Sequence, residues 1–464
     1  MSARRAAIVG AGPAGFYTAE QLLGQGFEVD LYDVLPTPFG LVRAGVAPDH
    51  PKIKSVTRVY EKTARKPGFR FFGGVELGSD VQREDLLERY HAVVYAVGTA
   101  TDNRLGIPGE DRPGSHSATE FVAWYNGHPD FADAEFDLSA TRAVVIGNGN
   151  VAIDVARMLV LDPDEINVTD TADHAVAGLA AAQVEHVILL GRRGPAQAAF
   201  TNPELRELGE LQRANVIVDP AEVELDEHSA AWLESDAAEP TNRRNVEILR
   251  EYSQLPPGDK SHRIELRFLR SPVEVLGEED SGCVTGLRVV RNRIEPDESG
   301  RLRAVSTGEE EVISCGLVLR SIGYRGNPLP GVPFDERRGL IHNEGGRVTS
   351  EDGERLPGEY AVGWIKRGPS GVIGTNKKDA ADTVARVVED VEAGRLNEPS
   401  ASSDPEAIEA WLRECVPSLV TWEGWEAIDT HEQGLGEPQG RPRVKLVRVP
   451  EMIAVAQGAI RVER

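Results

Sequence analysis

Residues 5–33 read RAAIVGAGPAGFYTAEQLLGQGFEVDLYD. The apolar run Ala6–Val9 is typical of a buried strand, and the apolar residues of Ala14–Gln25 recur with the period of an amphipathic helix. A second strand is predicted over Glu28–Tyr32. Strand, glycine turn, helix and strand in this order form a βαβ unit. The chain is therefore predicted to open with a parallel α/β sheet of the kind that binds dinucleotides.

The glycine turn at residues 10–15, GAGPAG, has the spacing that a dinucleotide pyrophosphate requires. Gly10 permits the tight turn, Gly12 lets a pyrophosphate approach the backbone, and Gly15 lets the helix pack against the sheet. The helix N-terminus then faces the phosphates. Asp33 ends the second strand, where an acidic side chain accepts a ribose hydroxyl. We interpret the turn as a dinucleotide site, the alternative being a tight turn without a ligand.

A second glycine motif, Gly147-Asn148-Gly149-Asn150-Val151-Ala152, follows the predicted strand Ala143–Ile146 and opens a helix over Val151–Leu161. The next strand, His186–Leu190, is followed by Arg192 and Arg193 instead of an acid. Two guanidinium groups at this place can bind a 2′-phosphate through charge-assisted hydrogen bonds, the alternative being a solvated surface pair. The second site therefore predicts NADP(H), and the acidic first site predicts a different dinucleotide, FAD.

Three strand–glycine runs, Val94–Gly98, Leu319–Gly323 and Tyr360–Gly363, look like the connections of flavoproteins that bind two dinucleotides. They imply an α/β fold with two Rossmann-like domains, the NADP domain being inserted into a discontinuous FAD domain.

The predicted FAD-binding domain comprises residues 1–106 and 325–464, and the predicted NADP(H)-binding domain comprises residues 107–324. Gly106–Ser117 is rich in proline and glycine and is predicted to be a linker.

The composition limits the classes of partner. The chain of 464 residues has a net charge of −24, which repels phosphate backbones and anionic lipids and so argues against binding to nucleic acid or membrane surfaces. An electron-carrier protein is not excluded, because docking depends on local patches. No apolar run reaches the length of a membrane span, so no integral membrane segment is predicted.

The three cysteines, Cys283, Cys315 and Cys415, lie in different segments, and no Cys-x-x-C is present. This argues against a dithiol redox couple and against an iron–sulfur or zinc site built on closely spaced cysteines, and no metal site is predicted. We interpret all three as ordinary thiols. Such sparse cysteine usage fits the reducing cytoplasm.

Four longer runs are more specific than either glycine motif. They are LPTPFGLVRAGVAPDHPKIK at 35–54, GNGNVAIDVAR at 147–157, LGRRGPAQAAFTNPELREL at 190–208 and GWIKRGPSGVIGTNKKDA at 363–380. Together they resemble the adrenodoxin-reductase-like family of ferredoxin–NADP reductases, especially its actinobacterial members. The resemblance covers nearly the whole chain and is weakest at residues 222–240 and in the tail.

The resemblance implies an FAD-dependent NADPH:ferredoxin oxidoreductase, with FAD and NADP(H) as cofactors and a small iron–sulfur ferredoxin as partner. The implied FAD contacts are Ala14, Asp33, Leu41, Val75, Trp364, Gly371, Val372 and Ile373. The implied NADP contacts are Asn148, Gly149, Asn150, Val151, Arg192, Arg193, Glu204 and Gly371. Asp33 departs from the family, in which glutamate is common at this place, and the shorter acid is expected to reach the ribose less easily.

Two further pairs are candidates for function. His50 lies in a loop between Asp49 and Pro51 and, with Glu207, is a candidate catalytic residue that positions the flavin edge or relays a proton. Arg243 and Arg244 follow an acidic stretch, and the resemblance points to arginines in this neighbourhood as the side that faces ferredoxin. The alternative interpretation of this arginine pair is a solvated surface.

Because no nucleophile–base pair, metal cluster or dithiol is identifiable, the flavin is expected to carry the chemistry. Three other functions are compatible with the motifs. One is an NADPH-dependent quinone or dye reductase, another a hydroxylating flavoprotein, and the third a nucleotide-sensing flavoprotein with little turnover.

Overall fold

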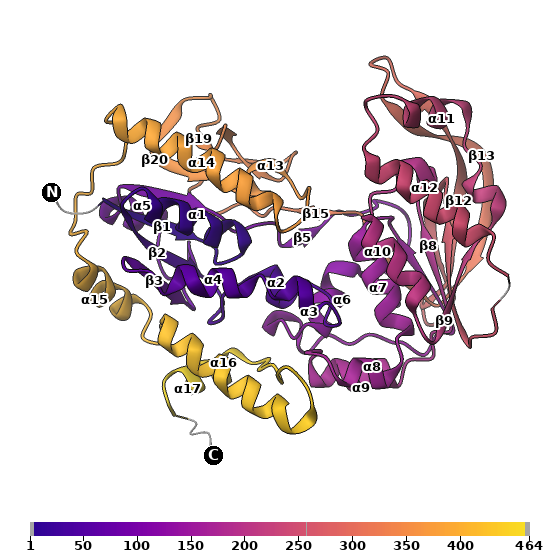
Figure 1. The fold of residues 1–464 in the computed structure, drawn as a ribbon, viewed down its shortest axis with the longest axis horizontal. Coiled ribbons are helices and arrows are strands. Elements are labelled where there is room, and N and C mark those ends of the chain that lie inside the picture. Colours follow the sequence, from indigo (N-terminus) through magenta and orange to yellow (C-terminus); the bar gives the residue numbers. More distant parts are fainter. Residues whose placement is uncertain (1–3, 257, 460–464) are drawn as a thin grey trace. The chain divides into compact units, whose positions relative to one another are not determined.

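The computed structural model describes residues 4–256 and 258–459, and the chain divides into two compact units (Figure 1). Unit 1 contains the residues up to Thr101, the short segment Asn126–Pro129 and the residues from Gly323 onward. Unit 2 contains Asp102–Tyr125 and Asp130–Ile322. The chain thus leaves unit 1 after Thr101 and returns to it for good at Gly323, whereas the sequence places these crossings at residues 106 and 325.

Unit 1 is built on a seven-stranded sheet of order β18-β19-β20-β4-β1-β2-β3, in which β20, β4, β1, β2 and β3 are parallel. In Figure 1 the indigo strands and the orange strands β19 and β20 belong to this one sheet, so both ends of the chain contribute to it. The strands are β1 (Arg4–Val9), β2 (Phe27–Asp33), β3 (Phe69–Gly73), β4 (Ala92–Tyr95), β18 (Asn343–Glu344), β19 (Arg347–Thr349) and β20 (Arg355–Ala361).

Helices cover both faces of this sheet because its central strands are apolar on both sides. In β1, Ala6 and Ile8 point into one core and Ala7 and Val9 into the other. Helices on the first face are α1 (Pro13–Gly24), α4 (Thr57–Ala64), α14 (Thr375–Glu392), α16 (Trp422–Gly436) and α17 (Val449–Ala456). Helices on the second face are α5 (Arg83–Arg89), α13 (Trp364–Arg367) and α15 (Pro405–Cys415).

Short elements complete unit 1. The helices α2 (Leu41–Ala44) and α3 (Pro51–Lys54) follow β2, and the strands β16 (Phe334–Asp335) and β17 (Leu340–Ile341) form a hairpin. Where the chain crosses between the units, β5 (Thr101–Asp102) pairs with β15 (Tyr324–Arg325).

Unit 2 contains a six-stranded parallel sheet of order β6-β14-β7-β8-β10-β9. Its strands are β6 (Ser115–Ser117), β7 (Arg142–Ile146), β8 (His186–Leu190), β9 (Ala214–Val218), β10 (His262–Arg267) and β14 (Leu317–Arg320). Helices cover one face, among them α6 (Ala118–Tyr125), α7 (Asn150–Val160), α9 (Asp173–Ala180), α10 (Asn202–Glu207) and α12 (Pro240–Ser253). The short helices α8 (Pro163–Asn167) and α11 (Glu227–Glu234) complete the unit.

An antiparallel three-stranded sheet packs on part of the other face of the unit 2 sheet. It consists of β11 (Arg270–Gly277), β12 (Val284–Pro296) and β13 (Leu302–Ser314). Val275, Leu287 and Ile313 from this sheet share a core with Val144 and Ile188 of the parallel sheet.

The α/β fold and the two parallel sheets confirm the predicted fold class. The predicted linker Gly106–Ser117 is wrong at its end, because Ser115–Ser117 forms the edge strand β6 beside β14. Among the described residues, no helix is both long enough and apolar enough to cross a membrane.

Candidate dinucleotide sites

The first glycine turn has the geometry that its sequence predicts. Gly10 has a φ of +111°, and a Cβ atom there would lie 2.5 Å from the carbonyl oxygen of Ala96. A Cβ at Gly15 would overlap the carbonyl oxygen of Gly10, whereas a Cβ at Gly12 would meet no atom within 4 Å. The outer glycines are therefore required by packing, and the middle one faces an open cradle. This arrangement fits the pyrophosphate of FAD at the N-terminus of α1.

Asp33 holds the turn in place. Its Oδ2 accepts a hydrogen bond of 2.7 Å from the backbone N–H of Ala11, and its Oδ1 accepts one of 3.0 Å from Leu35. Burial raises the pKa of this carboxyl to about 6, although both N–H groups favour its ionised form. The carboxylate is thus tied to the backbone of the glycine turn, and its predicted hydrogen bond to a ribose hydroxyl stays a prediction.

Two segments of unit 1 approach this turn. The backbone N–H of Phe39 donates to the carbonyl of Ala11 over 2.8 Å, and a Cβ at Gly40 would lie 3.1 Å from the Cα of Gly12. From the other chain end, a Cβ at Gly363 would lie 2.6 Å from the Cβ of Ala14. Two stretches that resemble FAD-binding segments are therefore packed against the FAD turn.

The remaining predicted FAD contacts differ in exposure. Leu41 and Val372 are large apolar side chains that are 37% and 54% exposed, as expected of side chains that a ligand covers. Val75 is buried, and its N–H donates to the carbonyl of Asp33 over 2.9 Å. The ring of Trp364 lies 5.4 Å from that of Tyr324. Gly371 is exposed with a φ of +80°, and Ile373 packs partly against the core.

The second glycine turn repeats this arrangement in unit 2. Gly147 has a φ of +149°, and a Cβ there would overlap the carbonyl oxygen of Ser321, whereas Gly149 faces open space. The buried Nδ2 of Asn148 has no hydrogen-bond partner within the described part of the chain. Asn150 begins α7, and its Oδ1 accepts from the N–H of Thr201 over 2.8 Å. An open cradle with an unused amide donor fits a second dinucleotide.

Arg192 and Arg193 lie beyond the carboxyl end of β8, next to this second turn. Neither guanidinium has an ion-pair partner among residues 4–256 and 258–459. Burial and the like charge of Arg192 lower the pKa of Arg193. Two unneutralised cations held side by side provide a site for a dianion, which fits the 2′-phosphate of NADP(H).

Comparison with known proteins gives consistent matches. Residues 4–189 match the family model described as pyridine nucleotide-disulphide oxidoreductase. NADPH-ferredoxin reductase FprA of Mycobacterium leprae is 48% identical over 461 residues, which cover 97% of this chain and 98% of that protein. The chain belongs to the NADPH–ferredoxin reductase family.

More distant and structural matches agree with this membership. The mitochondrial NADPH:adrenodoxin oxidoreductase of Salvelinus fontinalis is 42% identical, over 98% of this chain and 92% of that protein. The solved structure of Mycobacterium tuberculosis FprA in complex with NADPH matches with a TM-score of 0.92 and 47% identity, over 98% of this chain and 100% of that one. The resemblance inferred from the four sequence runs is thereby confirmed.

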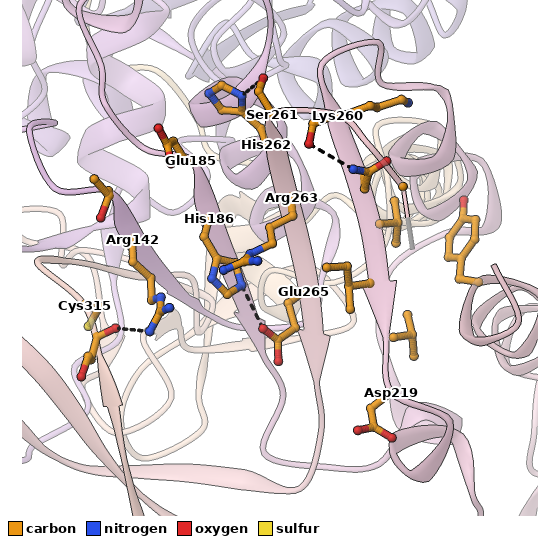
Figure 2. A pocket seen from close by; sticks show the side chains of 18 of the residues that line it. Arg142, Glu185, His186, Asp219, Lys260, Ser261, His262, Arg263, Glu265 and Cys315 are labelled. Carbon is orange, nitrogen blue, oxygen red and sulfur yellow. Dashed lines mark hydrogen bonds and ion pairs between the residues drawn. The ribbon is translucent and has the colours of Figure 1, made fainter. Parts of the chain in front are cut away.

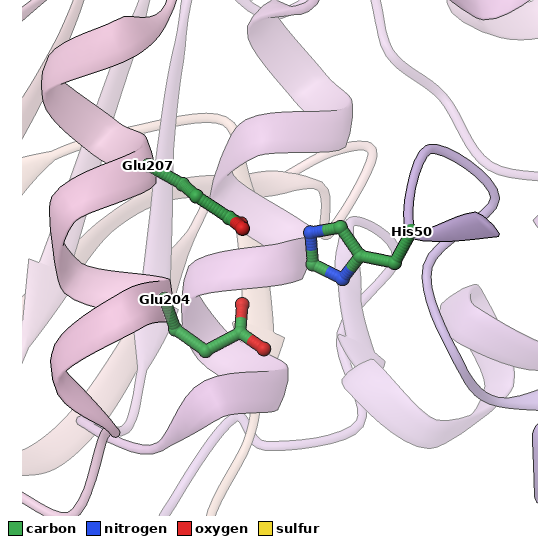
Figure 3. Close-up of side chains that lie close together, drawn as sticks. All are labelled: His50, Glu204 and Glu207. Carbon is green, nitrogen blue, oxygen red and sulfur yellow. The ribbon is translucent and has the colours of Figure 1, made fainter. Parts of the chain in front are cut away.

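In this chain, Glu204 and Glu207 project from α10 (Figure 3). Glu204 is buried, and the Oε2 of Glu207 lies 3.3 Å from Nη1 of Arg157, a buried side chain of α7. His50 precedes α3 in unit 1 and is also buried. The two predicted catalytic residues therefore belong to different units, and their joint role stays a proposal.

Sequence reasoning missed two residues that hold the site segments of the reductase. Asn292, buried in β12, donates from Nδ2 to the carbonyl of Arg192 over 2.8 Å. Asp379 in α14 accepts from the N–H of Gly363 over 2.6 Å and from Nζ of Lys366 over 2.9 Å. For Asn292 the available signal was a polar residue at an inward position between Val290 and Ile294, whereas Asp379 follows four polar residues and gave no such signal.

Unit 2 also has a groove of about 1130 Å³ that lies away from its glycine turn (Figure 2). Arg142, His186 and Arg263 lie side by side on its floor, at or near the amino ends of β7, β8 and β10. His186 is hydrogen-bonded to Glu265 over 2.8 Å. The glycine turn and Arg192 lie beyond the carboxyl ends of β7 and β8, where parallel sheets bind their ligands.

Proposed function

We propose that the chain takes hydride from NADPH onto bound FAD and delivers electrons singly to a ferredoxin. The observation that carries this proposal is the contrast between the two cradles. The turn at Gly10 is tied to a carboxylate, whereas the turn at Gly147 adjoins two unpaired guanidinium groups. One chain thus offers sites for two different dinucleotides. When bound, the flavin supplies both the hydride-accepting and the one-electron chemistry.

The residues of unit 1 would bind and orient the flavin nucleotide. Gly10 and Gly15 permit the tight turn and its packing, Gly12 leaves room for the pyrophosphate, and the N-terminus of α1 would contribute N–H groups to it. Asp33 would accept from the ribose. Apolar contacts would come from Leu41, Val75, Trp364 and the segment Gly371–Ile373.

The residues of unit 2 would bind the coenzyme. The backbone of Asn148–Val151 would contact its pyrophosphate, Arg192 and Arg193 its 2′-phosphate, and Glu204 a further polar group. Gly371 of unit 1 would contact the nicotinamide. His50 and Glu207 would position the flavin edge or relay a proton, and the ion pair with Arg157 at 3.3 Å would orient Glu207.

Ferredoxin would dock near Arg243 and Arg244, at the start of α12. Arg243 donates from Nε to the carbonyl of Leu233 over 2.7 Å and from Nη2 to that of Ser235 over 2.8 Å, so it caps the end of α11. Arg244 is paired with Glu247 and, over 3.6 Å, with Glu251, and all three side chains are exposed. Arg244 is therefore the member of the pair that a ferredoxin carboxylate would contact.

Rapid mixing of the holoenzyme with NADPH tests the first half of the proposal, and turnover with an added ferredoxin tests the second. We expect NADPH to reduce the flavin and so abolish its visible absorbance. With a cytochrome added as the final electron acceptor, the rate of cytochrome reduction should depend on the ferredoxin concentration. Absence of bleaching would favour a nucleotide-sensing protein. Bleaching with equal turnover in the presence and absence of ferredoxin would favour a quinone or dye reductase.

A cytoplasmic location is part of the same proposal, and rests on the three unpaired thiols Cys283, Cys315 and Cys415.

A further inference from the structure

Phe39, Gly40 and helix α2, which pack against the glycine turn at residues 10–15, are contacted by residues near the C-terminal end of the chain. Phe39 and Gly40 lie against Ala11 and Gly12, and the carbonyls of Phe39 and Gly40 accept the first hydrogen bonds of α2. Phe39 has a φ of +84°, a conformation that costs energy in a residue with a side chain. Such a conformation persists only where its surroundings fix it. Those surroundings include the ring of Trp425 in α16, whose centre lies 5.5 Å from that of Phe39.

The guanidinium of Arg43 forms a two-pronged ion pair with Glu432 of α16, with Nη1 to Oε2 at 2.8 Å. Glu432 is completely buried. It also accepts from the N–H of Leu446 over 2.8 Å and from Nη1 of Arg443 over 3.2 Å. Although burial alone would raise the pKa of Glu432, the neighbouring guanidinium groups hold it below its usual value, so the carboxylate is charged.

The residues that follow α16 also form a hydrogen bond with the backbone of Arg43. Nζ of the buried Lys445 donates to the carbonyl of Arg43 over 3.1 Å and to the carbonyl of Asn126 over 3.1 Å. Arg43 further lies over the ring of Trp425 in α16, at 5.4 Å from the ring centre. Side chain and main chain of one residue of α2 are thus both fixed by residues 425–445.

We propose that Glu432, acting through Arg43, is a positioning residue for FAD: it fixes α2 and thereby holds Gly40 over Gly12, at the cradle where the pyrophosphate would lie. The inference rests on the proposed function in assuming that FAD occupies the turn at Gly10. It assigns to the C-terminal segment a role in cofactor retention, not only in folding.

The test compares FAD dissociation from the purified holoenzyme of the wild type, Glu432→Gln and Asp390→Asn. Asp390 is a matched control, because it is 5% exposed and receives two hydrogen bonds from one arginine, Arg347. It lies 15 residues along α14 from Thr375, which is about 22 Å at the rise of an α-helix. Retention is read from flavin fluorescence in the filtrate after serial dilution, and unfolding is followed separately by circular dichroism.

Both variants are expected to melt at lower temperature than the wild type, but only Glu432→Gln is expected to raise the FAD dissociation constant, by at least ten-fold. Equal FAD affinity in the two variants would overturn the inference. If Glu432→Gln does not fold, the double variant Arg43→Met with Glu432→Met, which leaves no unpaired buried charge, decides the question. It is expected to fold and to release FAD, and wild-type affinity in it would overturn the inference. Failure of the wild type to bind FAD would instead refute the proposed function.

Discussion

Replacing both Arg192 and Arg193 by alanine is expected to remove most of the preference for NADPH over NADH. A hydrogen bond to a charged group contributes about 1.5–3 kcal/mol. Arg193 is partly buried and should lie near the upper value, whereas the exposed Arg192 is screened by water and should lie near the lower one. The pair then contributes about 4.5 kcal/mol. At about 1.4 kcal/mol per factor of ten, this corresponds to roughly a thousand-fold.

The assay is kcat/KM for NADPH and for NADH, with a dye as acceptor so that ferredoxin docking does not enter. The double variant should have a kcat/KM for NADPH that is lower by this factor and an unchanged kcat/KM for NADH. Arg206→Ala is the control, because Arg206 is an exposed arginine of α10 that pairs with Glu251 at 3.8 Å. Equal losses with both coenzymes would refute the reasoning, since they would show that the pair does not distinguish the 2′-phosphate.

Three further outcomes are expected. Gly12→Val should fold, because a Cβ at this position meets nothing within 4 Å, but should fill the pyrophosphate cradle and yield protein without flavin absorbance; full FAD occupancy would contradict the assignment. FAD affinity should fall as pH drops through about 6, because protonation of Asp33 removes the charged acceptor from the ribose, and it should level off above that pH. A pH-independent dissociation constant would contradict this, and Asp33→Asn, which cannot ionise, should show none of the dependence. Arg244→Glu should raise the KM for ferredoxin and leave NADPH-to-dye activity unchanged, and Arg243→Glu should lower the melting temperature by uncapping α11. Unchanged ferredoxin kinetics of Arg244→Glu across a salt series would place the docking face elsewhere.

The two βαβ openings could be predicted because local patterns determine them. The strand predicted over His186–Leu190 is β8 itself, and the helix predicted from Ala14 begins at Pro13. The start of α14 at Thr375 is not marked in the sequence, because its first turn is polar and shows no apolar period, although Asn376 is buried there. Ser115–Ser117 has no apolar pattern at all, and becomes a strand only because β14 offers it hydrogen-bond partners.

In the candidate sites, too, the features set by local sequence could be predicted and those set by tertiary contacts could not. Glycine spacing and the residue at the end of the next strand reveal the cradles, since both signals lie within about 50 residues of each other. The residues that fix the cradles come from elsewhere: Asn292 holds Arg192 from a different sheet, and Glu432 is 389 positions away from Arg43. Each of them is an ordinary polar residue until the tertiary fold supplies its partner.

The discontinuity of unit 1 has a consequence for how the protein is made. Arg43 leaves the ribosome early, but Glu432 and Lys445 follow only after all of unit 2 has been synthesised. At 5–20 residues per second, the 389 positions between Arg43 and Glu432 take about 20 to 80 s to translate. During this interval unit 2 can fold as a complete domain, while α2 still lacks its contacts with Glu432 and Lys445. We therefore expect the nascent chain to become competent for NADP(H) before it can retain its flavin.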